Sequence, residues 1–157
     1  MMKQNRKGFI LPISEATHAV IPEGNTNIEF YGFLRTESED VKPGTEPSMH
    51  LMFNMDKIGP GGEIEEHYHE PPVVDHVYYV ISGRIRAKVG DVEKIVGADT
   101  LIYSPSNIKH SVINVGKTIA KVIAIDASGE GERGGKVVYS KMPSGNLSGN
   151  TWKVAGT

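Results

Sequence analysis

The chain has no cysteine among its 157 residues. This absence excludes disulfide bonds, thiolate metal ligands and a thiol nucleophile, so any metal site must use histidine, aspartate or glutamate. Long apolar runs are missing too, because no stretch reaches the roughly 18 residues that a membrane-spanning helix needs. The apolar run near the N-terminus is too short for a signal peptide. We therefore expect a cytoplasmic protein.

The sequence has little excess charge of either sign. It carries 17 Lys and Arg against 19 Asp and Glu, a formal net charge of −2. This balance gives no electrostatic reason to expect nucleic acid or a membrane as a partner. With 38% hydrophobic and 23% charged residues and no internal repeat, the chain is typical of one globular domain. We expect a single domain over residues 1–157, with an N-terminal extension at 1–47 and a flexible tail at 144–157.

Glycine and proline, in contrast, are abundant. The 18 glycines and 9 prolines separate short runs rich in Val, Ile, Tyr and Thr, which is typical of short strands joined by tight turns. Only Ile13–Val20 hints at a helix, of one turn at most, and residues 36–47 and 128–135 are predicted to be loops. Strands are expected at residues 27–34, 49–55, 75–82, 84–89, 93–96, 100–103, 111–115, 119–125 and 136–139. Such a pattern favours a β-barrel or sandwich.

One expected hairpin is especially clear in the sequence. Apolar and charged residues alternate over 84–89, with Ile85, Ala87 and Val89 on one face. Gly90 and Asp91 then favour a tight turn into the next strand. This face is predicted to belong to the core.

Three of the six histidines fall within ten residues. His67 and His69 are two positions apart, so in a strand they share a face and can chelate one metal ion. Pro71 and Pro72 suit a turn, which would present His76 from the neighbouring strand. Histidine pairs at this spacing are more often exposed side chains than ligands, so the spacing alone does not identify a metal site.

The residues around these histidines match two motifs. Gly61 is followed by five residues and then His67-x-His69, and His76 is followed by six residues and Gly83. Residues 105–114 match the second motif, with Pro105, His110 and Asn114 at its characteristic positions. The two stretches, 61–83 and 105–114, resemble the conserved motifs of the cupin superfamily, in its small single-domain (cupin 2) form. The resemblance implies an all-β antiparallel double-stranded β-helix, or jelly-roll barrel, and metal ligands at His67, His69, His76 and His110.

Three departures from the motifs are visible. His76 stands where the family usually has a glutamate ligand, which implies a four-histidine site, and it lies a few residues further from His69 than usual. Counting six residues back from Gly83 selects His76, while the adjacent Asp75 remains the alternative ligand. Asp99 and Asn107 replace glycines, and both residue types tolerate the left-handed backbone region that glycine adopts.

Four imidazoles would leave the full 2+ charge on the ion and make it a strong Lewis acid. Imidazole suits Fe, Ni, Cu and Zn, whereas Mn usually prefers some oxygen ligands. The expected cofactor is one divalent transition-metal ion (Fe, Mn, Ni, Zn or Cu), whose identity the sequence leaves open. Tyr78 lies on the His76 side of its strand, so it is a candidate catalytic residue that orients substrate or transfers a proton. Alternatively, Tyr78 is an aromatic residue of the hydrophobic core.

Other residues near the motifs have less specific patterns. The residues before the ligands include Glu63, Glu65 and Glu66, which suggest a solvated loop. One of these glutamates could form a hydrogen bond with a ligand histidine. Asn114 is expected to be structural. His18 is expected at the surface, and His50 lies on an alternating strand where it could face a pocket or water.

The fold does not determine the reaction. We expect a small-molecule substrate and consider first a dioxygenase-type oxidoreductase. The second hypothesis is a non-redox Lewis-acid cyclase, isomerase or lyase, and the third a small-molecule-binding protein without turnover. The resemblance also implies a homodimer formed by packing one sheet against its mate, with the region before residue 48 as a candidate for strand exchange.

Overall fold

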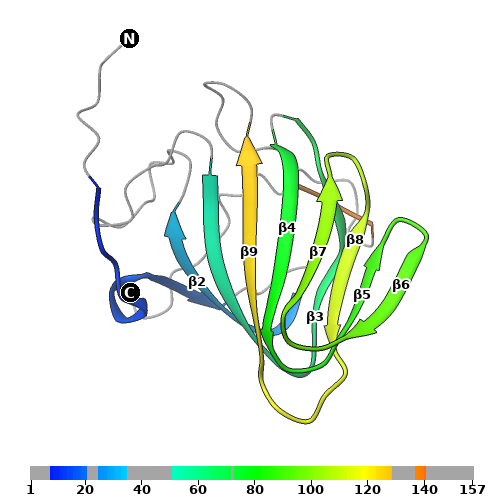
Figure 1. Cartoon of the computed structure of the whole chain (residues 1–157), viewed down its shortest axis with the longest axis horizontal. Helices are drawn as coiled ribbons and strands as arrows, with labels where there is room; N and C mark the ends of the chain where they lie inside the picture. Colours follow the sequence, from blue (N-terminus) through cyan, green and yellow to red (C-terminus); the bar gives the residue numbers. More distant parts are fainter. Residues whose placement is uncertain (1–7, 21–24, 35–50, 72, 129–136, 141–157) are drawn as a thin grey trace.

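The computed structural model describes residues 8–20, 25–34, 51–71, 73–128 and 137–140. It is an all-β protein, as predicted, and the part described contains ten strands and one turn of 3-10 helix (Figure 1). No helix in these ranges has the length and apolarity of a membrane span. The elements are η1 (Ile13–Glu15), β1 (Thr17–Val20), β2 (Asn25–Leu34), β3 (Leu51–His69), β4 (Val73–Ser82), β5 (Ile85–Val89), β6 (Val92–Val96), β7 (Thr100–Pro105), β8 (His110–Asn114), β9 (Ala120–Ser128) and β10 (Val137–Tyr139).

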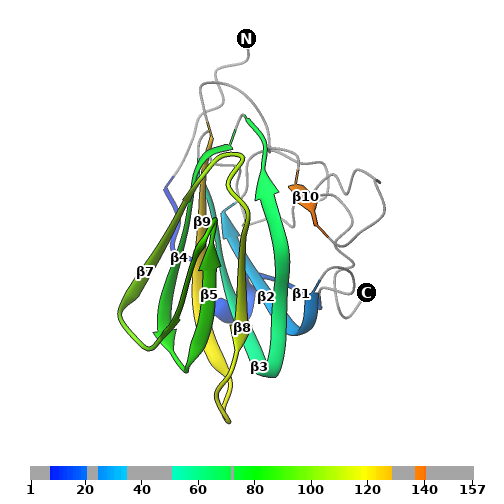
Figure 2. The same ribbon diagram turned by 90° about the vertical axis from the view of Figure 1, so that its right-hand side faces the viewer.

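The strands form one strongly curved sheet that folds over itself as a nearly closed barrel (Figures 1 and 2). One wall has the order β7-β4-β9-β3-β2-β1, and the other has β6-β5-β8-β3-β10. All pairings are antiparallel. The arrangement is the jelly-roll barrel that the motifs implied. We call the first set of strands wall 1 and the second wall 2.

Strand β3 belongs to both walls. Its first half, Leu51 to Ile58, pairs with β9 and β2, and its second half pairs with β8 and β10. The crossing lies at residues 59–62, Gly-Pro-Gly-Gly, where Gly61 has a φ of 73°. Glycine and proline usually interrupt a strand, so the sequence predicted only 49–55 here. That prediction was too short, because these residues bend the strand from one wall to the other without ending it.

The core lies between the walls and consists mostly of aliphatic side chains. The expected alternation over residues 84–89 is confirmed, with Ile85 and Ala87 buried and Val89 packed against the core. The hairpin at Gly90 and Asp91 is confirmed as well, with Val89 paired to Val92 across it.

Two of the turns confirm predictions made from residue type. Asp99 has a φ of 60° and Asn107 a φ of 64°, the left-handed conformation that glycine usually supplies. At the other predicted turn, the amide of Val73 donates to the carbonyl of Glu70 at 3.3 Å.

Several predicted features lie partly or wholly outside the described residues. They are Pro72, His50, the loop at 36–47, nearly all of 128–135 and the tail at 144–157. Within the predicted N-terminal extension, β1 and β2 join wall 1. The sequence indicated β2 but not β1.

Candidate metal centre

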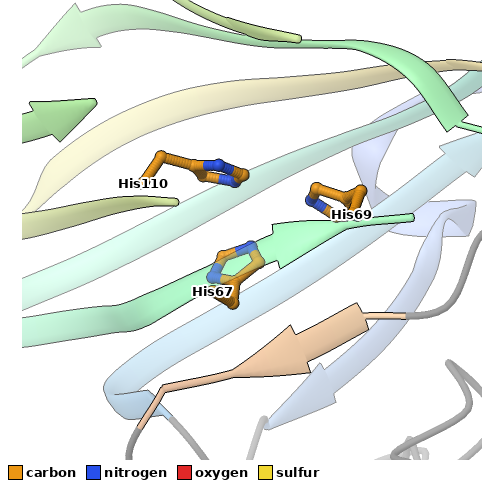
Figure 3. Close-up of side chains that lie close together, drawn as sticks. All are labelled: His67, His69 and His110. Atoms are coloured by element: carbon orange, nitrogen blue, oxygen red, sulfur yellow. The ribbon is translucent and has the colours of Figure 1, made fainter. Parts of the chain in front are cut away.

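Four histidines come together between the two walls. His67 and His69 lie on the second half of β3, His110 on β8 of the same wall, and His76 on β4 of the opposite wall. The His67 and His110 ring centroids are 4.3 Å apart, and those of His69 and His76 are 4.6 Å apart. All four side chains are buried. Figure 3 shows the imidazoles of His67, His69 and His110 around a common space above β3.

Three of the rings are held through their Nδ1 atoms. The Nδ1 of His67 donates to the carbonyl of Glu65 at 2.6 Å, and that of His110 to the carbonyl of Ile108 at 3.0 Å. His76 donates from Nδ1 to the Asp126 carboxylate. Ligand histidines in metalloproteins usually donate one ring N–H in this way, which orients the other nitrogen toward the ion.

Three Nε2 atoms of the cluster have no hydrogen-bond partner. The Nε2 atoms of His69, His76 and His110 are buried and unpaired. Leaving buried polar atoms unpaired is costly, and three of them on neighbouring rings indicate a missing partner. A divalent metal ion fits this donor set, because imidazole nitrogen is a common ligand for such ions.

The possible ligand atoms form two overlapping groups, and the spacing within each group fits an ion. One ligand atom each from His67, His69 and His110 lie within 4.8 Å of one another, and so do atoms of His69, His76 and Asp126. His69 is common to both groups. Ligands at about 2.0–2.2 Å from one ion are necessarily separated by distances of this size or less.

Electrostatics keep the rings in the neutral form that metal binding requires. Burial, with the adjacent His69, lowers the pKa of His67 to about 3. Burial also lowers the pKa of His69 to about 4, despite the opposing effect of Asp126. For His110, burial and the neighbouring histidines shift the pKa far below its usual value. At neutral pH these three imidazoles carry no proton that would compete with an ion.

Asp126 is the site residue that the sequence interpretation missed. It lies on β9, directly opposite His76 on β4, and its side chain is 13% exposed. Burial raises the pKa of its carboxyl, but His76 and His69 outweigh this effect and hold the pKa at about 2. The predicted strand ended at residue 125, one position before Asp126, whereas β9 continues to Ser128. The signal was present nevertheless, because Asp126 continues the inward-facing series of Val122 and Ala124.

Tyr78 lies beside the histidines. Asp56, a second carboxyl group that the sequence interpretation missed, lies in the adjoining layer of the barrel. The Tyr78 ring is buried, 4.3 Å from the His76 ring centroid, and burial raises its pKa well above the usual value, with added effects of Asp56 and Asp126. Asp56 is buried on β3, where it accepts a hydrogen bond from Asn54 Nδ2 at 3.1 Å. Burial raises the pKa of Asp56 to about 7. The interior therefore holds one ionised carboxyl group and one whose pKa is near neutral pH.

The alternative ligand Asp75 faces away from the site. It is exposed on the outer face of β4 and accepts a hydrogen bond from the Tyr103 hydroxyl at 2.6 Å. His18 lies elsewhere, stacked on Tyr31 with a ring-centroid distance of 4.7 Å. The acidic residues before the ligands are not a free loop, because they belong to β3.

Comparison with known proteins gives the family context. A family model described as "Cupin domain" matches residues 54–126, which include all four histidines and Asp126. No curated protein sequence matches the chain significantly. The family match therefore rests on the part of the chain that forms the site.

Solved structures share the fold at low sequence identity. The polyketide cyclase RemF from Streptomyces resistomycificus superposes with a TM-score of 0.65 at 13% identity, covering 88% of this chain and 89% of that one. A predicted oxalate decarboxylase from Thermotoga maritima gives 0.60 at 20% identity, covering 76% and 99%. KdgF from Halomonas sp. gives 0.61 at 15% identity, covering 79% and 96%. At these identities the similarity establishes the architecture alone.

Proposed function

We propose that this chain, a cupin by the family model that matches its residues 54–126, is a metal-dependent enzyme acting on a small organic molecule. His67, His69, His76 and His110 would hold one divalent ion. The observation that carries this proposal is the set of three buried, unpaired Nε2 atoms on neighbouring rings, whose centroids are 4.5–5.2 Å apart. When bound, such an ion would supply Lewis-acid polarisation of a substrate oxygen.

The protein groups around the histidines favour proton-transfer chemistry of the non-redox kind. Asp126 is ionised and partly exposed, so it can accept a hydrogen bond from a substrate hydroxyl. Tyr78 keeps its hydroxyl proton and can donate a hydrogen bond to a substrate oxygen. A hydrogen-bond donor and an anionic acceptor beside an ion suit an isomerase, cyclase or lyase, which must bind and stabilise an enolate. We therefore place this class ahead of the oxidative one.

A dioxygenase-type oxidoreductase is the second candidate. Its support is the donor set itself, because four imidazoles suit iron, nickel and copper as well as zinc. Substrate positioning would then fall to Tyr78 and Asp126 through hydrogen bonds. The two candidates differ in their need for O2 and for a redox-active ion.

The first test is elemental mass spectrometry of protein purified without added metal. Wild type should carry about one equivalent of a transition metal, and His76→Ala should lose it. His18→Ala, a histidine outside the site, should match wild type. Zinc, with turnover under anaerobic conditions, would support the non-redox candidate, whereas Fe, Ni, Mn or Cu with oxygen consumption would support the oxidative one. Wild type that binds no metal even after reconstitution would contradict the proposal.

We also propose that the protein forms a homodimer through the outer face of wall 1. This face exposes Leu101 and Tyr103 of β7 and Ile81 of β4. Clustered exposed apolar side chains are typical of protein interfaces. Light scattering should give the mass of a dimer for wild type and of a monomer for Leu101→Arg. The control Val92→Arg changes an equally exposed side chain on wall 2 and should remain dimeric.

A further inference from the structure

The short C-terminal strand β10 lies against the part of β3 that carries the ligands. It pairs antiparallel with β3, Val137 opposite His69 and Tyr139 opposite His67. Residues directly opposite each other on antiparallel strands have side chains on the same face. Val137 and Tyr139 therefore share the inward face of the two histidines. Figure 3 shows β10 running alongside this end of β3.

The Tyr139 ring reaches the candidate metal centre. Its centroid is 5.1 Å from that of His67, at an interplanar angle of 39°. On the opposite side of β3, His110 contacts the same imidazole, with centroids 4.3 Å apart. His67 is therefore flanked by a second ligand and a phenol. The Tyr139 side chain is only partly buried.

Polar contacts fix the position of β10. The backbone amide of Ser140 donates to the carbonyl of Glu66 at 2.9 Å, and its hydroxyl donates to the Glu66 carboxylate at 2.9 Å. That carboxylate also pairs with Lys88 of β5 at 3.3 Å. Because these contacts adjoin Tyr139 in sequence, they limit how far its ring can move from His67.

We propose that Tyr139 is a ligand-contacting residue of this site, whose hydroxyl donates a hydrogen bond to an anionic oxygen of a chelating substrate. This inference rests on the proposed function and narrows the substrate class to molecules with a chelating oxygen pair, such as an enolate or a hydroxy acid. A phenol hydroxyl suits this role, because hydrogen bonds to charged oxygens are stronger than those between neutral groups.

The test uses cobalt(II)-loaded protein and acetohydroxamate, an anionic chelator with two oxygen donors. Binding is followed by the visible absorption of cobalt in wild type, Tyr139→Phe and Tyr68→Phe. Tyr68 is the matched control, because it is paired with Val138 and lies on the opposite face of β3 from the ligands. We expect one equivalent of cobalt in all three proteins, and hydroxamate binding about tenfold weaker in Tyr139→Phe alone.

The outcomes separate this inference from the proposed function. Equal hydroxamate affinity in wild type and Tyr139→Phe, with cobalt bound normally, would overturn the role of Tyr139 and leave the metal centre intact. Loss of affinity in Tyr68→Phe to the same extent would also overturn it, since the effect would then not depend on the face. Wild type that binds no cobalt would overturn both proposals. An unchanged cobalt spectrum of Tyr139→Phe before hydroxamate is added shows that the variant is folded.

Discussion

The Nδ1 atom of His76 donates a hydrogen bond to Oδ1 of Asp126, and the two residues are direct cross-strand partners on β4 and β9. The contact joins a candidate ligand to the acidic group with the lowest pKa described inside the barrel. It orients the imidazole, whose ring centroid lies 4.6 Å from that of His69 and 4.5 Å from that of His110. The carboxylate beside the histidines is thus Asp126, whereas the sequence offered Asp75 as the alternative ligand, and Asp126 has a ligand atom within 4.8 Å of those of His69 and His76.

Replacing Asp126 by Asn should weaken metal binding about 10–100-fold without abolishing it. The amide can still accept the hydrogen bond from His76, but it lacks the negative charge that makes the imidazole a better ligand. Competition against a chromophoric chelator measures the affinity. Asp75→Asn, a neighbouring aspartate on the outer face of β4, is the control and should bind like wild type. Equal affinities for Asp126→Asn and wild type would contradict the role of this pair.

Asp56→Asn should stabilise the protein at pH 8 and have little effect near pH 4. Burial raises the pKa of Asp56 to about 7, whereas an unfolded aspartate titrates near 4. Between these values the native state holds a proton that the unfolded state has released, so stability falls as the pH rises through this window. The gain at pH 8 should be on the order of a few kcal/mol. Urea unfolding at both pH values checks it, and a gain at pH 4 as large as at pH 8 would refute the assignment.

The metal-free protein should lose stability as the pH falls from about 6.5 to about 4. In this window the unfolded chain protonates histidines that the folded chain keeps neutral, because the pKa values of His67 and His69 are lowered to about 3 and about 4. Each such histidine costs roughly 1.4 kcal/mol per pH unit. Asp56 titrates with the opposite sign in the same range, so the measurement is best made in Asp56→Asn. A melting temperature that does not change over this range would contradict the neutral histidine cluster.

Asn114→Ala should destabilise the fold by about 2–4 kcal/mol. The buried Asn114 amide donates to the carbonyls of Ile58 and Thr118, each at 2.8 Å, and its Oδ1 accepts from the Gly116 amide at 2.9 Å. The substitution leaves these backbone groups without their partner. The control Asn107→Gly changes an exposed residue whose φ of 64° suits glycine and should be nearly neutral. Chemical denaturation compares the two, and equal stabilities would show that Asn114 is not structural.

Local patterns in the sequence were sufficient for several features. His67 and His69 share a face because side chains in a strand alternate. The turns at Asp99 and Asn107 follow from the residue types that tolerate a positive φ. The alternation over residues 84–89 identified core positions, since a half-buried strand repeats every two residues. These features depend only on neighbours along the chain.

Tertiary structure decided the rest. Asp126 meets His76, 50 positions earlier, and Tyr139 meets His67, 72 positions earlier, only because particular strands are neighbours in a particular register. A shift of one residue would turn either side chain to the opposite face, and the pattern within each strand does not specify its partner. The glycines and proline at residues 59–62 likewise predicted the end of a strand. Long-range pairing on both sides of this bend nevertheless keeps it within β3. The sequence by itself determined the barrel motifs and the histidine positions, whereas cross-strand register determined which acidic and phenolic groups surround them.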